Sequence, residues 1–328
     1  MSLIVTDKLT KVYRSNIKQP GIKGTLKNLF HAEYVDKVAV DQATFTMEEG
    51  QLLACIGENG AGKSTLIKML VGILGQTSGD VSVYGQNPMK HHAEYLRKIG
   101  VIFGQKTNMW WDIPVIESYN AMKVIYKVPA DQFKKTMDRV TDILDLAPIL
   151  NSPARKLSLG QRMKADIGMI FLHSPRILFL DEPTIGLDIN VKIAIRQFIR
   201  EMNKETGVSV LLTSHDLADI DQICDDTLVL SKGKIFYQGG LDDLKHEYAS
   251  RKIVTIQGSQ KADIMALLPD VNLSSEGRKA RLDYDINQYQ SEAVLSAISK
   301  CYDIEDINIQ DPGIDHVVSE IFKRGASS

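Results

Sequence analysis

The residues with the clearest chemistry form a glycine-rich run at positions 57–64, which reads Gly-Glu-Asn-Gly-Ala-Gly-Lys-Ser. Glycines let such a loop curl, so that successive backbone N–H groups point at one anion. Lys63 supplies a positive charge for the outer phosphates of a nucleotide, and Ser64 supplies a hydroxyl ligand for Mg²⁺. The helix that follows directs its positive end at the same point. The spacing therefore predicts a binding site for a nucleoside triphosphate.

Polar residues that fit the rest of such a site follow other apolar runs of the chain. Asp181 ends one run, and an aspartate beside a phosphate loop holds Mg²⁺, usually through water. Glu182 comes next and suits a general base that polarises the attacking water. His215 follows another run and is placed to hydrogen-bond near the outermost phosphate, while Gln105 suits the metal and water shell.

The elements that must position these residues read as a mainly parallel α/β sheet. We expect buried strands at 52–56, 177–180 and 208–213, each followed by a polar or glycine-rich stretch. A helix is expected from Ser64 onward, because its apolar residues recur at helical spacing. Open α/β sheets bind ligands at the carboxyl ends of their strands, which is where the polar residues fall.

The length and composition of the chain limit the classes of protein to which it can belong. The chain has 328 residues, enough for two domains, and a formal net charge of −2, which disfavours a protein that coats nucleic acid. No apolar run has the length needed to span a bilayer, and no signal peptide opens the chain. Cys55, Cys224 and Cys301 have neither disulfide nor metal spacing and read as small buried residues, which fits a reducing cytoplasm.

Two segments stand outside the main α/β pattern. From residue 251 to 328 the order of strands and helices is βαββαβ plus a terminal helix, which predicts a small ferredoxin-like α+β domain. The apolar stripe of the terminal helix, expected at 314–322, suits either core packing or a partner surface. Residues 18–36 read as a basic amphipathic insertion that lies on a membrane, in a partner's groove or against its own domain.

In their order along the chain these motifs resemble the ATP-binding cassette (ABC) ATPases, over roughly residues 1–240. The signature is Leu157-Ser158-Leu159-Gly160-Gln161, the D-loop is Ile185-Gly186-Leu187-Asp188, and Tyr13 stands where this family has an aromatic that stacks on adenine. The resemblance implies a P-loop nucleoside triphosphatase fold with a mixed sheet core and a helical signature subdomain at about 106–165.

The resemblance also implies the chemistry. Two such domains bind ATP and Mg²⁺ head to tail, and each ATP lies between one chain's phosphate loop and the other chain's signature. ATP closes the dimer, and hydrolysis, with Glu182 as base and with His215 and Gln105 assisting, reopens it. The implied metal contacts are Ser64, Gln105 and Asp181, and the implied nucleotide contacts are Tyr13, Gly57, Asn59, Gly60, Gly62, Lys63, Ser64, Thr65, Asp181, Ser158, Gly160, Gln161 and Asp188.

The motifs depart from the family pattern at two places. Leu159 replaces the usual glycine at the third signature position, and the D-loop begins Ile185-Gly186 rather than with small polar residues. Neither change removes a catalytic group, so we expect sites that hydrolyse ATP.

Among members of the family, the chain resembles the ATPase subunit of a drug or polysaccharide exporter. The resemblance implies an integral-membrane permease, a second ATPase chain that is identical or paralogous, and a peripheral position on the cytoplasmic face of the membrane. Trp110 and Trp111 follow the glutamine loop, which centres on Gln105, and suit anchors for the permease or, alternatively, core residues. The other hypotheses are a soluble cassette ATPase that acts on ribosomes or DNA, and a regulatory sensor. No residue identifies the cargo.

Overall fold

The computed structural model describes residues 2–16, 34–90, 92–104, 106–214, 216–248 and 251–310. The chain divides into two compact units, Met1–Gly239 and Gly240–Ser328. Gln105, His215, most of the expected insertion and the expected terminal helix lie outside the described residues. Residues 34–36, which we assigned to the insertion, instead belong to a strand, because they pair across to residues 14–16.

The first unit is built around a six-stranded sheet with the order β5-β6-β7-β3-β8-β9. Its central strands, β3 (Leu52–Ile56), β6 (Ile177–Asp181) and β7 (Ser209–Thr213), are buried at every position. The neighbouring strands within β5-β6-β7-β3-β8 all pair in parallel. Parallel strands covered on both faces need continuous apolar runs, which is why these strands were predictable from the sequence. The outer strands are β5 (Ile99–Phe103), β8 (Asp226–Ser231) and β9 (Lys234–Gly240).

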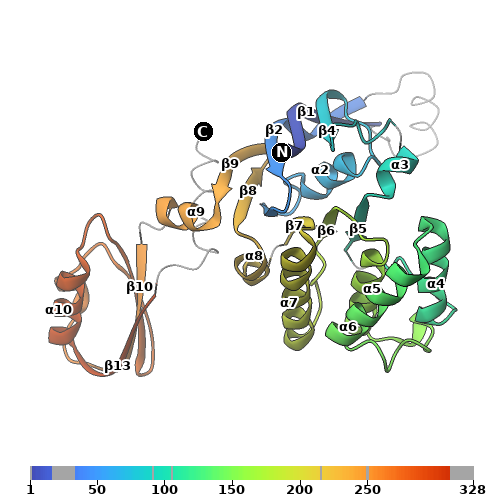
Figure 1. Cartoon of the computed structure of the whole chain (residues 1–328). Coiled ribbons are helices and arrows are strands. Elements are labelled where there is room, and N and C mark those ends of the chain that lie inside the picture. The colour runs from blue at the N-terminus through green and yellow to red at the C-terminus, as the bar shows by residue number, and fades with distance from the viewer. Residues whose placement is uncertain are drawn as a thin grey trace, which may run out of the picture. The chain divides into compact units, whose positions relative to one another are not determined.

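A second, antiparallel sheet of the first unit has the order β2-β1-β4. Its strands are β1 (Ser2–Asn16), β2 (Tyr34–Glu48) and β4 (Ser78–Val83). Helix α2 (Lys63–Leu70) shares one apolar core with both sheets, to which Ile4, Leu53 and Leu66 contribute. Figure 1 shows this helix beside β4, the strand that follows it in the chain. The start of α2 is therefore fixed by packing on two sides.

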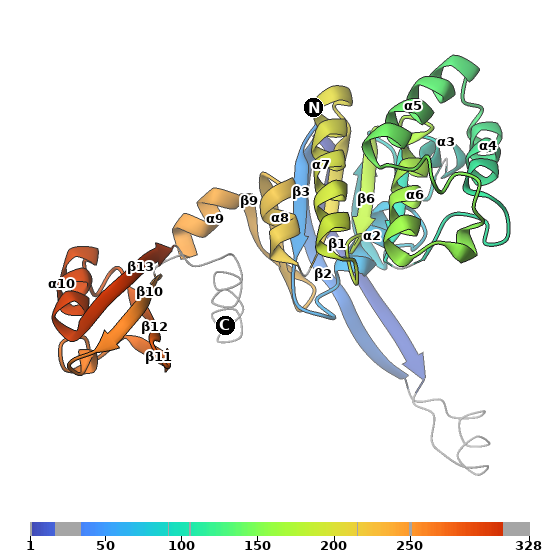
Figure 2. The ribbon, with the colours of Figure 1, turned by 90° about the horizontal axis from the view of Figure 1, so that it is seen from below.

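Helices α4, α5 and α6 gather at one side of the main sheet (Figure 2), which agrees with the expected helical subdomain. Their bounds are Val115–Tyr126, Ala130–Ile143 and Leu159–Phe171, so α6 continues beyond the expected end at 165. The hydroxyl of Tyr119 donates to the carbonyl of Ala165 at 2.6 Å and joins α4 to α6. The remaining helices of this unit are α3 (His92–Leu96), α7 (Ile189–Thr206) and α8 (Leu217–Ile223).

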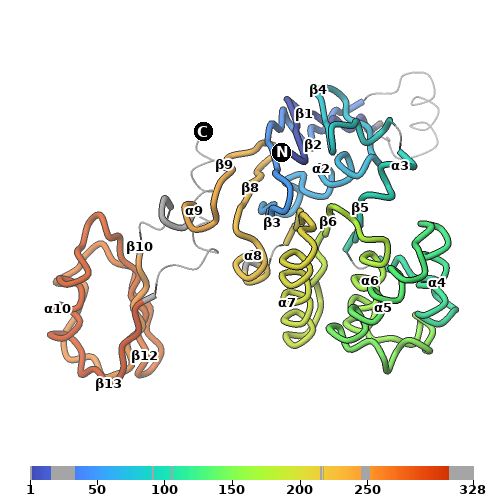
Figure 3. The backbone as a smooth tube through the Cα atoms, viewed as in Figure 1, coloured from blue at the N-terminus to red at the C-terminus, as the bar shows by residue number. Residues whose placement is uncertain are grey.

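The second unit begins with α9 (Leu241–Tyr248) and has an antiparallel sheet of the order β11-β12-β10-β13. The strands are β10 (Arg251–Gln260), β11 (Asn272–Glu276), β12 (Lys279–Asp285) and β13 (Tyr302–Gln310). Helix α10 (Ser291–Cys301) packs on one face of the sheet through a separate apolar core, as Figures 1 and 3 show. This strand order is the expected ferredoxin-like arrangement.

The apolar spacing of residues 262–268 predicts an α-helix as the first helix of the βαββαβ pattern, and this prediction is wrong. Only a 3₁₀ turn, η2 (Ile264–Ala266), forms there, capped by Asp263 through the N–H of Met265. The backbone N–H groups of Lys261 and Ala262 both donate to the carbonyl of Cys301, so this stretch is tied to the end of α10. Proline at 269 then prevents the helix from continuing.

Two further sequence observations concern burial and membrane spanning. All three cysteines are buried, as expected, and burial raises the pKa of the Cys55 thiol to about 12. Within the residues described above, no helix is both long and apolar enough to cross a membrane.

Candidate nucleotide site

The glycine-rich loop joins β3 to α2, and two of its glycines are required by close contacts. A Cβ atom on Gly57 would lie 2.3 Å from the carbonyl oxygen of Leu230, and one on Gly62 would lie 2.2 Å from that of Ala39. Gly62 also has a φ of 109°, which only glycine adopts without strain. The loop is thus held in its curl by β8 on one side and β2 on the other.

Lys63 is only 6% exposed, and its Nζ donates to the carbonyls of Gly57 and Glu58 at 2.6 and 3.1 Å. The positive charge of Lys63 is therefore held across the glycine-rich loop. No side chain caps the start of α2, where Gly62 is the N-cap residue. The first N–H groups of a helix lack partners within it, so this end is suited to a phosphate group.

A hollow of about 250 Å³ lies against this loop. Most of its lining was expected from the sequence, and Lys37 and Ala39 were not. They come from β2, where Lys37 pairs with Tyr13 of β1. Lys37 and Ala39 reach the hollow because β1 pairs with β2, and no local sequence pattern predicts this pairing. The complete lining is Tyr13, Lys37, Ala39, Asn59, Gly60, Gly62, Lys63, Ser64, Thr65 and Glu182.

Asp181 stands next to the loop, at the end of β6, and is 8% exposed. Its Oδ1 accepts hydrogen bonds from the hydroxyls of Ser64, at 3.1 Å, and Thr213, at 2.6 Å. Among the described residues there is no cluster of three acidic, histidine or cysteine ligands. Two hard oxygen donors nevertheless fit Mg²⁺, since this ion keeps several waters and takes its other ligands from phosphates.

Glu182 has the left-handed φ of 54°, which is uncommon for a residue with a side chain. Its N–H donates to the carbonyl oxygen of Thr213 at 3.0 Å and to its hydroxyl at 3.2 Å. These bonds hold the chain in a sharp turn directly after the strand, and the Glu182 side chain lines the hollow. Thr213, the last residue of β7, thus orders both acidic residues, and we had not singled it out from the sequence.

The signature residues do not line this hollow. Ser158 caps α6: its hydroxyl accepts from the N–H of Gln161 at 3.2 Å, and the Gln161 side chain accepts from the Ser158 N–H at 3.0 Å. Gly160 lies against α7, since a Cβ there would be 2.9 Å from Val191. Asp188 caps α7 through the N–H groups of Asn190 and Val191. Six expected nucleotide contacts are absent from the lining of this chain's own hollow: Gly57, Asp181, Ser158, Gly160, Gln161 and Asp188.

Gln105 and His215 lie outside the described residues, but their neighbours do not. The N–H of Gly104 donates to the carbonyl of Asp181 at 2.7 Å. The end of β5, just before Gln105, therefore lies against the end of β6. After it, Asp166 of α6 accepts from the Thr107 hydroxyl at 3.0 Å and the Asn108 N–H at 2.8 Å. Burial raises the pKa of the Asp166 carboxyl to about 6, against these hydrogen bonds, which lower it.

The two tryptophans that follow are about half exposed, Trp110 at 51% and Trp111 at 47%. The alternative that both are core residues is therefore wrong. The guanidinium of Arg162, from α6, lies 4.4 Å from the centre of the Trp111 ring. The Trp111 side chain is thus oriented by the signature helix while its outer face remains accessible.

Known proteins resemble this chain over the same region. Residues 40–185 match the family described as ABC transporter. The chain is 31% identical over 236 residues to the bacitracin transport ATP-binding protein BcrA of Bacillus licheniformis. The aligned residues make up 72% of this chain and 75% of that protein. It is 33% identical over 215 residues to the methionine import ATP-binding protein MetN of Geobacillus kaustophilus, covering 64% of this chain and 63% of that protein.

The fold also has solved counterparts. A structure described as the ATP binding subunit of an ABC transporter superimposes with a TM-score of 0.63 at 24% identity, over 75% of this chain and 93% of that chain. That likeness concerns the fold, and the identity to BcrA over three quarters of its length concerns the family. With the phosphate loop, the acidic strand and the signature helix all formed, the chain belongs to the ABC transporter family of ATP-binding proteins and is an ATPase of that type.

Proposed function

We propose that two copies of this chain, or this chain and a paralogue, form a dimer that hydrolyses ATP and drives export through a separate membrane permease. The observation that carries the proposal is the division of the motifs. Lys63, Ser64 and Glu182 line one hollow, whereas Ser158 and Asp188 do not. Because the signature residues begin a helix, where N–H groups favour an anion, a second chain's signature would complete the site.

In this site Ser64 and Asp181 would hold Mg²⁺, which offsets the charge of the β- and γ-phosphates when it is bound. Lys63 would pass from the loop carbonyls to the outer phosphates. The Glu182 carboxylate would take a proton from the attacking water, and His215 and Gln105 would assist it. The hydrogen bonds to Thr213 hold the Glu182 backbone in its turn before ATP arrives, which favours a small reorganisation during the reaction.

Trp110 and Trp111 would anchor the permease. Large aromatic side chains dominate the energy of protein interfaces, and these two are exposed beside the glutamine loop. Transport agrees with relatives named for bacitracin transport and for methionine import. We favour export because the second unit follows the cassette, as in the exporter subunits that the sequence resembles.

The test is co-expression with any multi-span membrane protein found to be encoded beside this chain, followed by purification from membranes. We expect the chain to co-purify with it, and Trp110→Ala with Trp111→Ala to lose that association while ATP binding is retained. Phe236→Ala is the matched control, since Phe236 is 42% exposed on β9 and belongs to no proposed surface. ATPase activity stimulated by ribosomes or DNA, with no permease bound, would overturn the transport proposal.

A further inference from the structure

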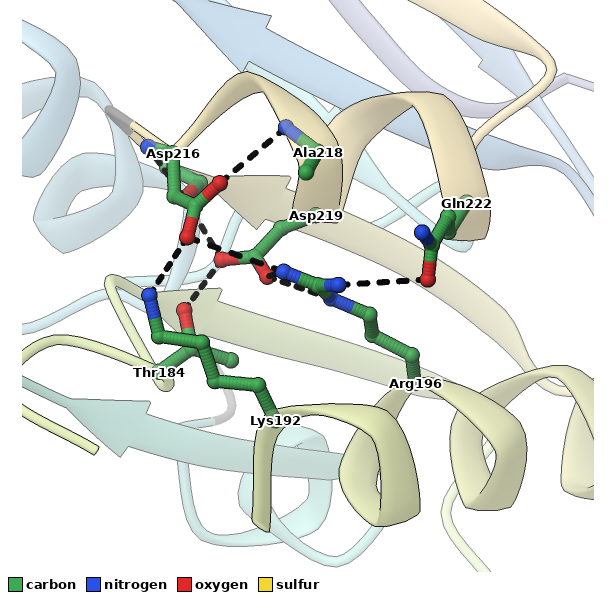
Figure 4. Close-up of polar contacts among 8 residues, drawn as sticks. Thr184, Lys192, Arg196, Asp216, Ala218, Asp219 and Gln222 are labelled. Atoms are coloured by element: carbon green, nitrogen blue, oxygen red, sulfur yellow. Dashed lines mark hydrogen bonds and ion pairs between the residues drawn. The ribbon is translucent and has the colours of Figure 1, made fainter. Parts of the chain in front are cut away.

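One carboxylate in the first unit is completely buried and accepts hydrogen bonds from three separate segments (Figure 4). Asp219 of α8 is 0% exposed. Its Oδ1 accepts from Nε of Arg196, in α7, at 2.7 Å. Its Oδ2 accepts from the hydroxyl of Ser214 at 2.9 Å and from that of Thr184. The guanidinium of Arg196 is itself buried, with a side-chain exposure of 4%.

A second carboxylate extends the cluster towards solvent. Asp216 Oδ2 lies 2.5 Å from Nζ of Lys192 and 3.6 Å from the Arg196 guanidinium. The N–H of Asp216 donates to the Ser214 hydroxyl at 3.0 Å, and its other carboxylate oxygen caps α8 through Ala218. Figure 4 shows Lys192 and Arg196 reaching from one face of α7 to these two acids.

Stability alone does not account for such a cluster. Removing two charges from water costs several kcal/mol per ion, and buried ion pairs are often replaced by apolar residues without loss of stability. A buried pair does, however, fix geometry, because every donor and acceptor must be satisfied in one arrangement. The cluster therefore acts through the segments that Asp219 and Arg196 hold in place.

The segments are those that carry the proposed chemistry. Thr184 stands two residues after Glu182, and Ser214 and Asp216 are the covalent neighbours of position 215. Lys192 and Arg196 lie one and two turns after Asp188, the residue that caps α7. The cluster therefore joins both catalytic segments to the helix that begins at the D-loop.

We propose that Arg196 and Asp219 are positioning residues for ATP hydrolysis, which set the placement of the segments around Glu182 and Ser214 relative to the start of α7. The inference rests on the proposed function, since it takes Glu182 as the base. A displacement of about 1 Å at a reacting group can cost about 100-fold in rate. Loss of the cluster should thus lower kcat and leave ATP affinity nearly unchanged, because none of its side chains lines the nucleotide hollow.

The experiment compares ATP turnover and ATP binding in full-length variants, at a temperature where circular dichroism shows each to be folded. Asp219→Asn keeps the shape of the side chain but removes its charge, and we expect kcat to fall by roughly 10- to 100-fold while the ATP dissociation constant stays within about twofold. Arg196→Lys, which keeps the charge, should recover part of the loss relative to Arg196→Met.

Arg200→Met is the matched control. Arg200 lies one turn further along α7 and pairs with Asp225 at 3.1 Å, but both side chains are exposed, at 42% and 65%. It should keep the parent kcat. The double variant Arg196→Met with Asp219→Leu removes both charges, so it distinguishes a loss of stability from a loss of catalytic positioning. We expect its thermal stability to exceed that of Arg196→Met, while its kcat stays low.

Two outcomes would overturn the inference: Asp219→Asn turning over ATP within twofold of the parent, or Arg200→Met losing as much activity as Asp219→Asn. A failure of the proposed function is recognised separately, by including Glu182→Gln. If Glu182→Gln is as fast as the parent, the assigned base is wrong. If it is inactive while Asp219→Asn is fully active, only the positioning role fails.

Discussion

The hydroxyl of Ser64 donates a hydrogen bond to Oδ1 of Asp181 at 3.1 Å, although 117 residues separate them in the chain. The same oxygen accepts from Thr213 at 2.6 Å, so three elements meet at one carboxylate. In the proposed mechanism the Ser64 hydroxyl and the Asp181 carboxylate would together hold Mg²⁺ beside the glycine-rich loop.

Ser64→Ala should weaken binding of ATP in the presence of Mg²⁺ by about tenfold, or about 1.4 kcal/mol, and leave binding of metal-free ATP nearly unchanged. The reason is that the hydroxyl serves the metal rather than the phosphates. Isothermal titration calorimetry with and without Mg²⁺ measures both constants, and Ser275→Ala, on an exposed strand of the second unit, is the control. Equal losses with and without Mg²⁺ would contradict the assignment.

Two glycines of the loop should respond differently to alanine. Gly60 and Gly62 both have positive φ, 84° and 109°, so each substitution should cost about 1 kcal/mol of backbone strain. Only at Gly62 does the new Cβ meet backbone, at 2.2 Å from the Ala39 oxygen, whereas nothing lies within 4 Å at Gly60. Urea unfolding should therefore show Gly62→Ala to be the less stable by roughly 2 kcal/mol or more. Equal midpoints would show that the loop relaxes freely.

Asp166 predicts a pH dependence of stability. Its pKa rises from 3.8 to about 6 in the folded chain, chiefly through burial, so between these values the native state binds more protons than the unfolded state. The free energy of unfolding should therefore fall as the pH rises from about 4 to about 6. Asp166→Asn keeps an oxygen for Thr107 and Asn108 and should remove this fall, a gain of up to about 3 kcal/mol above pH 6.

The measurement for Asp166 is urea unfolding followed by tryptophan fluorescence from pH 4 to pH 7. Both tryptophans of the chain lie beside the loop that Asp166 holds. Asp142→Asn, on the exposed surface of α5, is the control. Parallel curves for the parent and Asp166→Asn would rule out the raised pKa.

Tyr13 lines the hollow and is 40% exposed, which suits stacking on a nucleotide base. Tyr13→Ala should weaken ATP binding by about 1–3 kcal/mol, the usual value of aromatic–base stacking, and should not affect binding of inorganic triphosphate. Tyr13→Phe should retain ATP affinity. Competition binding with the two ligands measures the difference, and an equal loss for both would place Tyr13 on the phosphates instead.

The sequence predicted those parts that are determined by local pattern. The strands β3, β6 and β7 are continuous apolar runs, and the loop, acidic pair and signature are consecutive motifs. Lys37 and Thr213 escaped prediction because they reach the site through strand pairing, between β1 and β2 and between β6 and β7. The Arg196–Asp219 ion pair was not predicted for a similar reason. In the sequence, a basic residue on α7 and an acidic residue on α8 are typical of solvent-exposed helix faces, and only the packing of the two helices buries them together.

The same limit explains the errors in the second unit and at the insertion. The apolar spacing at 262–268 fits a helix, but the Cys301 carbonyl captures the N–H groups at its start and a proline follows. Residues 34–36 become part of β2 by pairing with residues 14–16. In each case a contact with a distant segment outweighed local preference.

The central claim is that one chain holds half of an ATP site and a second chain completes it. Light scattering of full-length Glu182→Gln, which should bind ATP without hydrolysing it, tests this most directly. With Mg²⁺ and ATP the mass should double from that of the 36.6 kDa chain, and adding Ser158→Arg should abolish the doubling. A mass that stays at one chain with ATP bound, or a dimer indifferent to Ser158→Arg, would contradict a site shared between two copies of this chain.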